Sequence, residues 1–114
     1  MVVDIINEYR KANGKEYIFV WNPVENDYCM EHCLYMAKLQ CFEHAPEHLR
    51  KGKAEAIAKC GFIIDNFTTV RYLIFNVINE SQKHKDVVLN YENLAYGFYI
   101  HNYTAYLVIR GWNG

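Results

Sequence analysis

The chain has 114 residues, which is enough for one domain with its own hydrophobic core. Its 12 Lys and Arg residues nearly balance its 13 Asp and Glu residues, and this net charge of -1 gives no bulk attraction for nucleic acid or an anionic membrane. No apolar run approaches the ~20 residues that span a bilayer, so we expect no integral membrane segment. We also find no secretory signal in the sequence, and the helical pattern starts directly after Met1.

Two helices are predicted in the first third of the chain. Apolar residues recur at helical spacing from Val2 to Ala12, and Gly14 follows as a stop signal. Asn22 as N-cap and Pro23 in the first turn predict the start of a second helix that runs to about Leu39. We expect His32 to be a hydrogen-bonded core histidine rather than a metal ligand. The expected inner face of this helix comprises Tyr28 or Cys29, His32 or Cys33, Met36 and Leu39.

Four cysteines are present, an even number that is too small for a disulfide-dense scaffold. Cys29 and Cys33 are four residues apart on the second predicted helix, where disulfide geometry is rarely met, so we interpret them as small core-facing thiols. A metal cluster of Cys29, His32 and Cys33 is the alternative, although it lacks the Cys-x-x-Cys spacing of strong zinc motifs.

The middle of the chain reads as a series of helices. Pro46 marks the first turn of a short helix through about Lys51. Lys53 to Lys59 consists of good helix formers, so propensity alone predicts helix there. Phe67 to Ile78 has apolar residues at helical spacing and is predicted as a further long helix. Ser81 to Asn90 is expected to form another short helix or turn with buried Val and Leu residues.

The last part of the chain has the clearest strand signal. Leu94 to Ile100 and Tyr103 to Arg110 are rich in β-branched and aromatic residues, and His101-Asn102 between them suits a tight turn. His101 is therefore expected to be an exposed turn residue. Helices followed by a C-terminal hairpin predict an α+β fold with helices packed on a small antiparallel sheet.

Three of the five histidines and five of the 13 carboxylates lie between Glu43 and His84. Two histidines and one or two carboxylates drawn together in a cleft would form a divalent-metal site or a general acid/base pair. The alternative is that these are ordinary solvated surface residues.

Five segments, taken in their order along the chain, resemble the motifs of the CAP superfamily, also called SCP-like. The family includes cysteine-rich secretory proteins, insect venom antigen 5 and plant pathogenesis-related proteins. The segments are Ile6-Asn7-Glu8-Tyr9-Arg10 with Asn13-Gly14, Trp21-Asn22-Pro23, Glu43-His44-Ala45-Pro46-Glu47, Ala54-Glu55-Ala56-Ile57-Ala58, and Glu80-Ser81-Gln82-Lys83-His84 continuing to Asn90.

The resemblance implies a single CAP-type domain over residues 1–114, built as a three-layer α-β-α sandwich around a small antiparallel sheet. It also implies a cleft in which His44, Glu55, His84 and Glu80 could hold a loosely bound divalent cation such as zinc. Ala54, Ala56 and Lys83 depart from the family pattern, and each departure could reshape the cleft rim or its hydrogen bonds. The resemblance further implies that Lys53–Lys59 enters the sheet region and that the protein is secreted or displayed at a cell surface.

Three functions follow from these patterns. The first is a CAP-type binding domain without enzymatic activity, with a divalent cation in the cleft and a neighbouring groove for a lipid, peptide or protein. The second is a zinc hydrolase using the H-x-x-E-H sequence of His44, Glu47 and His48, although Pro46 should start a helix that excludes His44. The third is a metal-free interaction domain with an aromatic contact face made of Tyr96, Phe98, Tyr99, Tyr103 and Tyr106.

Overall fold

The computed structural model describes residues 1–61 and 63–114 and confirms the predicted α+β class with an antiparallel sheet. The helices are α1 (Val2–Ala12), α2 (Pro23–Leu39), α3 (Glu47–Arg50), α4 (Asn66–Tyr72) and α5 (Gln82–Leu89). A π-helical segment η1 (Leu73–Val77) and a 3-10 segment η2 (Ile78–Glu80) continue α4. The strands are β1 (Ala54–Cys60), β2 (Asn93–His101) and β3 (Thr104–Trp112), and their order in the sheet is β1-β3-β2.

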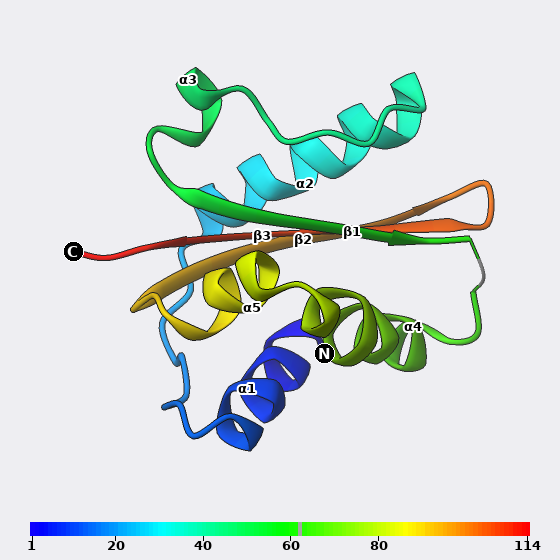
Figure 1. Ribbon diagram of the computed structural model, residues 1–114. Coiled ribbons are helices and arrows are strands. Elements are labelled where there is room, and N and C mark those ends of the chain that lie inside the picture. The colour runs from blue at the N-terminus through cyan, green and yellow to red at the C-terminus, as the bar shows by residue number, and fades with distance from the viewer. Residues whose placement is uncertain (62) are drawn as a thin grey trace.

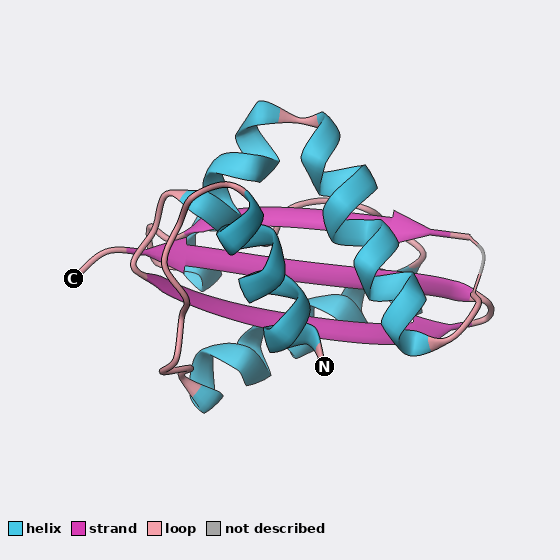
Figure 2. Cartoon of the chain, turned by 90° about the horizontal axis from the view of Figure 1, so that it is seen from below, coloured by secondary structure: helices cyan, strands magenta, loops and turns pink. Residues whose placement is uncertain are grey.

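Helices cover both faces of the sheet (Figure 1). The helices α2 and α3 lie on one side, and α1, α4 and α5 lie on the other, where Figure 2 shows them in front of the three strands. Because β3 is the central strand, its residues Ala105 to Arg110 are buried by the two layers and by both neighbouring strands. Among the described residues, no helix is both long enough and apolar enough to cross a membrane.

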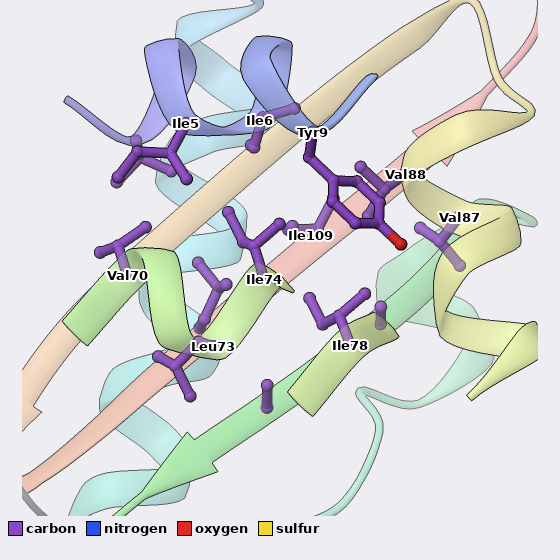
Figure 3. Packing of buried hydrophobic residues seen from close by; sticks show 14 of the residues in the cluster. Ile5, Ile6, Tyr9, Val70, Leu73, Ile74, Ile78, Val87, Val88 and Ile109 are labelled. Atoms are coloured by element: carbon purple, nitrogen blue, oxygen red, sulfur yellow. The ribbon is translucent and has the colours of Figure 1, made fainter. Parts of the chain in front are cut away.

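The larger part of the core lies between the sheet and the layer of α1, α4 and α5 (Figure 3). Ile5, Ile6 and Tyr9 of α1 meet η1, η2 and α5 there. The Tyr9 ring packs edge-on against Phe75, with 5.1 Å between ring centroids, and its hydroxyl donates to Asn79 Oδ1. The predicted helix at residues 2–12 is confirmed, and its apolar stripe faces this core.

The second part of the core lies between α2 and the opposite face of the sheet. The predicted cap is confirmed, because Asn22 Oδ1 accepts from the amides of Val24 and Glu25. Cys29, Cys33 and Met36 are fully buried as expected, whereas Leu39 is 61% exposed, so its placement on the inner face was wrong. Gly97 of β2 lets the two elements approach closely, since a Cβ there would lie 2.5 Å from the backbone of Cys29.

The helix predicted from propensity for Lys53–Lys59 is wrong, because these residues form β1. β1 pairs antiparallel with β3 from Ala54 opposite Gly111 to Cys60 opposite Ala105. Ala56 and Ala58 face the α1 layer, and Ile57 faces α2. Burial on both faces and pairing with a distant strand outweigh the local helix preference. The placement of this segment in the sheet agrees with what the resemblance implied.

The predicted helix at Phe67–Ile78 is present but changes type along its length. It begins after Asp65, whose side chain accepts from the Thr68 amide, and passes from α to π and then to 3-10 geometry. Val70, Leu73 and Ile78 are buried, while Phe67 is half exposed. The predicted short helix at 81–90 is confirmed as α5, with Val87 and Val88 buried, whereas Leu89, also expected to be buried, is only partly buried.

The hairpin is confirmed, but its turn lies one residue later than predicted. Asn102 and Tyr103 have φ of 49° and 63°, so they form the turn, and His101 is the last residue of β2. His101 is half-buried and stacks on Tyr99, with 6.2 Å between ring centroids. The expectation of an exposed turn histidine was therefore wrong. Two consecutive left-handed residues match the strand twist of a tight hairpin.

The expected aromatic contact face is not formed as one surface. Tyr96 and Phe98 pack with the core of the α1 layer, whereas Tyr99 and Tyr106 pack with the α2 side. Tyr103 lies in the turn and is 83% exposed. Alternation along the two strands separates these side chains to opposite faces of the sheet.

Candidate functional site

A buried carboxylate organises the predicted site. The Glu55 side chain is fully buried and accepts three hydrogen bonds. Its Oε1 accepts from the Ala45 amide at 2.9 Å and lies 3.0 Å from His44 Nδ1, and its Oε2 accepts from Arg110 Nε at 2.8 Å. A buried carboxylate is stable only when paired and hydrogen-bonded, and this one is satisfied at both oxygens.

The sheet register places Glu55 and Arg110 together. They lie directly opposite each other on β1 and β3, and both point toward the α2 side. Cys29 of α2 is close by, since Arg110 and Glu55 both act electrostatically on its thiol. Burial raises the pKa of the Cys29 thiol to about 12, and the positive charge of Arg110 offsets this only in part. The prediction that Cys29 and Cys33 are small core-facing thiols is confirmed, since both are buried and neither forms a disulfide.

His44 lies at the surface end of this network. Its side chain is half exposed, while the Glu55 carboxylate that it contacts is inaccessible to solvent. Because a carboxylate only accepts hydrogen bonds, Nδ1 carries the proton in this contact. In the neutral imidazole, Nε2 then presents a lone pair, so Glu55 fixes the orientation and tautomer of His44.

His84 reaches the same region from the other layer. It lies on α5, and β1 is an edge strand, so side chains of the two layers can approach each other around that edge. Burial lowers the pKa of His84 below its ordinary value of 6.5, and the charge of His44 lowers it further. His84 Nδ1 is buried and has no hydrogen-bond partner in the described part of the chain. Because the charge of His44 acts on the pKa of His84, the imidazoles of His44 and His84 are electrostatically coupled.

The fourth predicted residue is separate from the other three. Glu80 is exposed at the end of η2 and makes no hydrogen bond or ion pair with His44, Glu55 or His84. Across residues 1–61 and 63–114, no group of three or more His, Cys, Asp or Glu side chains is arranged to hold a metal ion. The alternative metal cluster of Cys29, His32 and Cys33 is likewise not formed among these residues. With both Glu55 oxygens already bonded, these residues do not fit a carboxylate-ligated metal centre as they are arranged.

The lowered pKa of His84 predicts a pH dependence of stability. Since His84 binds a proton more readily in the unfolded chain than in the folded protein, the free energy of unfolding should have its full value above about pH 6.5 and fall as the pH drops below it. We expect the melting temperature to fall less between pH 7.5 and 5.5 in His84→Gln than in the wild type. Replacing the exposed His48 by Gln should leave the wild-type slope, and an equal slope in all three proteins would contradict the prediction.

The H-x-x-E-H sequence does not form the helix that its zinc chemistry requires. Pro46 has an extended backbone, with ψ of 151°, and α3 begins only at Glu47. His44 therefore lies outside the helix and is directed to Glu55, and Glu47 pairs with Arg50 at 3.1 Å. His44 and His48 do not share a helical face.

A cleft of about 460 Å³ lies beside the buried pair, between α2 and the segment 45–51. Arg110 lines it, and of the lining residues the sequence suggested a site role only for His32, in the alternative metal cluster. The other lining residues are Tyr28, Glu31, His32, Tyr35, Ala45, Pro46, Leu49 and Lys51. The signal in the sequence that could have indicated Arg110 is the charge at the end of the predicted strand Tyr103 to Arg110.

His32 connects the cleft to the core. It is buried, as predicted for a core histidine, and Nε2 donates to the Glu43 carbonyl at 2.7 Å. Its ring stacks on Tyr35, with 5.8 Å between centroids and 16° between planes. The hydrogen bond from His32 to the Glu43 carbonyl holds the start of the segment 43–51 against α2.

The chain matches no protein-family model and no curated protein, so its membership of the CAP superfamily stays a prediction from the motifs.

Proposed function

We propose that the protein is a non-enzymatic binding domain that holds a small ligand in the cleft between α2 and segment 45–51. The observation that carries the proposal is the half-exposed apolar lining around a buried charged group. Tyr28, Tyr35 and Leu49 are 39%, 44% and 55% exposed in the cleft, and Arg110 lies among them at 2%. Apolar walls with a few placed polar groups are typical of small-molecule sites.

Binding rather than catalysis is favoured by the state of the nucleophiles near the cleft. The Cys29 thiol is buried, and with its pKa raised to about 12 it stays protonated and weakly nucleophilic at neutral pH. The helices on both faces of the sheet support the finer part of the proposal, a CAP-type three-layer sandwich.

A neutral aromatic probe, 3-phenylpropan-1-ol, tests the cleft. In amide and methyl NMR spectra we expect shifts confined to the residues that line it. Leu49→Ser should weaken binding about fivefold, because it removes roughly 1 kcal/mol of apolar contact. Leu39→Ser, at an equally exposed leucine of α2 outside the cleft, is the matched control. Shifts spread over the whole surface, or equal weakening in both variants, would contradict the proposal.

The divalent cation stays a separate prediction, and the observation that favours it is the unpartnered, buried Nδ1 of His84 beside His44. If zinc binds these imidazoles, it should raise the melting temperature at pH 7.5, and the double variant His44→Ala and His84→Ala should remove the rise. The rise should also weaken below about pH 6.5, since protonated imidazoles do not bind metal. An unchanged melting temperature in the wild type would end the prediction.

A further inference from the structure

We infer that the cleft takes a small carboxylate with an aromatic or apolar body, and that the guanidinium of Arg110 binds the carboxylate. The inference rests on the proposed function, since it names the ligand class of the same cleft.

Arg110 has hydrogen-bond donors that the protein does not use. An arginine carries N–H donors on all three guanidinium nitrogens. Nε donates to Glu55 Oε2, whereas Nη1 and Nη2 make no hydrogen bond with the described residues. Among the described residues, His84 Nδ1 is the one fully buried side-chain N or O atom that lacks a hydrogen-bond partner. Since Nη1 and Nη2 of Arg110 also lack a partner, they are not fully buried. Since Arg110 lines the cleft, its unused donors are open to a ligand there.

Glu55 cannot turn to satisfy these donors. Its Oε1 is held by the Ala45 amide and His44, and its Oε2 is held by Nε. The buried pair of Glu55 and Arg110 is therefore held in place, with Nε of the guanidinium bonded to Glu55 and the Nη1 and Nη2 donors available. A planar guanidinium edge matches a carboxylate with two parallel hydrogen bonds, which are stronger than bonds to a neutral acceptor.

The charged side chains that line the cleft are Arg110, Lys51 and Glu31. The buried Glu55 balances the charge of Arg110 from beneath, so an anion would be favoured by Lys51 and by the unused donors of Arg110. Lys51 lines the same cleft, with its Nζ 5.9 Å from the centroid of the Tyr28 ring. Glu31 also lines the cleft and opposes an anion, but it is exposed. Solvent screens the charge of Glu31 far more than that of Arg110, which is 2% exposed.

The body of the ligand would lie against the apolar wall. Tyr28 and Tyr35 of α2 face Pro46 and Leu49 across the cleft. Tyrosine rings prefer aromatic partners in stacked or edge-on geometry. The cleft volume of about 460 Å³ suits a molecule of small-ligand size.

The test compares 3-phenylpropanoate with 3-phenylpropanamide, which have the same shape and differ in charge. We expect the carboxylate to bind at least about tenfold more tightly, from charge-assisted hydrogen bonds. The Arg110 Nε–H resonance should shift with the carboxylate and stay in place with the amide. Equal affinities with both probes in the cleft would overturn the inference and leave the proposed function standing. Failure of both probes and of 3-phenylpropan-1-ol to bind would overturn both.

Replacing Arg110 itself would leave Glu55 unpaired, so surface variants supply the second measurement. Glu31→Gln removes the opposing charge and should raise carboxylate affinity about twofold to threefold, with amide affinity unchanged. Asp27→Asn removes another exposed charge of α2 that does not line the cleft, and it should change neither affinity. An equal rise in the two variants would mean a nonlocal charge effect and would overturn the assignment to Arg110.

Discussion

Replacing Arg110 by methionine is expected to lower the free energy of unfolding by about 3–5 kcal/mol. The substitution leaves the fully buried Glu55 carboxylate without its charged partner. The two remaining hydrogen bonds, from the Ala45 amide and His44, do not supply a fixed positive charge. Urea unfolding followed by tryptophan fluorescence would measure the loss.

Two further variants separate the buried pair from charge removal in general. Arg71→Met breaks a surface ion pair with Glu8 and should cost less than about 1 kcal/mol. The double variant Glu55→Gln and Arg110→Met should be more stable than Arg110→Met alone, because an amide can still accept from the Ala45 N–H without carrying a charge. If Arg110→Met unfolds like Arg71→Met, the buried pair does not stabilise the fold as described.

Gly97→Ala is expected to lower the free energy of unfolding by about 3 kcal/mol. The added Cβ would lie 2.5 Å from the Cys29 carbonyl carbon and the Met30 nitrogen, which are backbone atoms of α2. A side chain could rotate away from such a contact, but a helix backbone can only move as a unit. The methyl group should therefore push α2 away from β2 and loosen the core around Cys29 and Cys33.

Gly61→Ala is the control for the same chemical change. Apart from its chain neighbours, no described residue lies within 4 Å of a Cβ at Gly61, so stability should stay within about 0.5 kcal/mol of the wild type. Thermal unfolding of both variants gives the comparison. Similar melting temperatures would mean that the close approach of α2 and β2 does not limit packing at Gly97.

Features set by local interactions could be predicted from the sequence. The start of α2 depends on Asn22, which accepts from the amides of Val24 and Glu25, and on Pro23 in the first turn, and its predicted bounds were correct. β1 shows the opposite case, since its alanines, Glu55 and Lys59 favour helix locally. Their strand conformation depends on β3, about 50 residues away, and on the burial that this pairing creates.

The candidate site divides in the same way. The motifs pointed to His44 and Glu55, and the structure brings them into contact, with His84 electrostatically coupled to His44. The role of Arg110 could not be predicted, because its partner lies 55 residues away and only the strand register reveals the pair. The one-residue shift of the hairpin has a related cause, since Tyr103 adopts a left-handed conformation that its residue type disfavours.

The cleft wall at residues 43–51 is fixed mainly through its main chain. Its one buried residue is the small Ala45. The Ala45 amide is held by Glu55, its carbonyl by Arg50, and the Glu43 carbonyl by His32. Such contacts specify the path of the wall and leave the identities of most side chains facing the cleft free. Residues 46–49 could therefore be replaced to change the lining of the cleft, while the main-chain path of the wall stays the same.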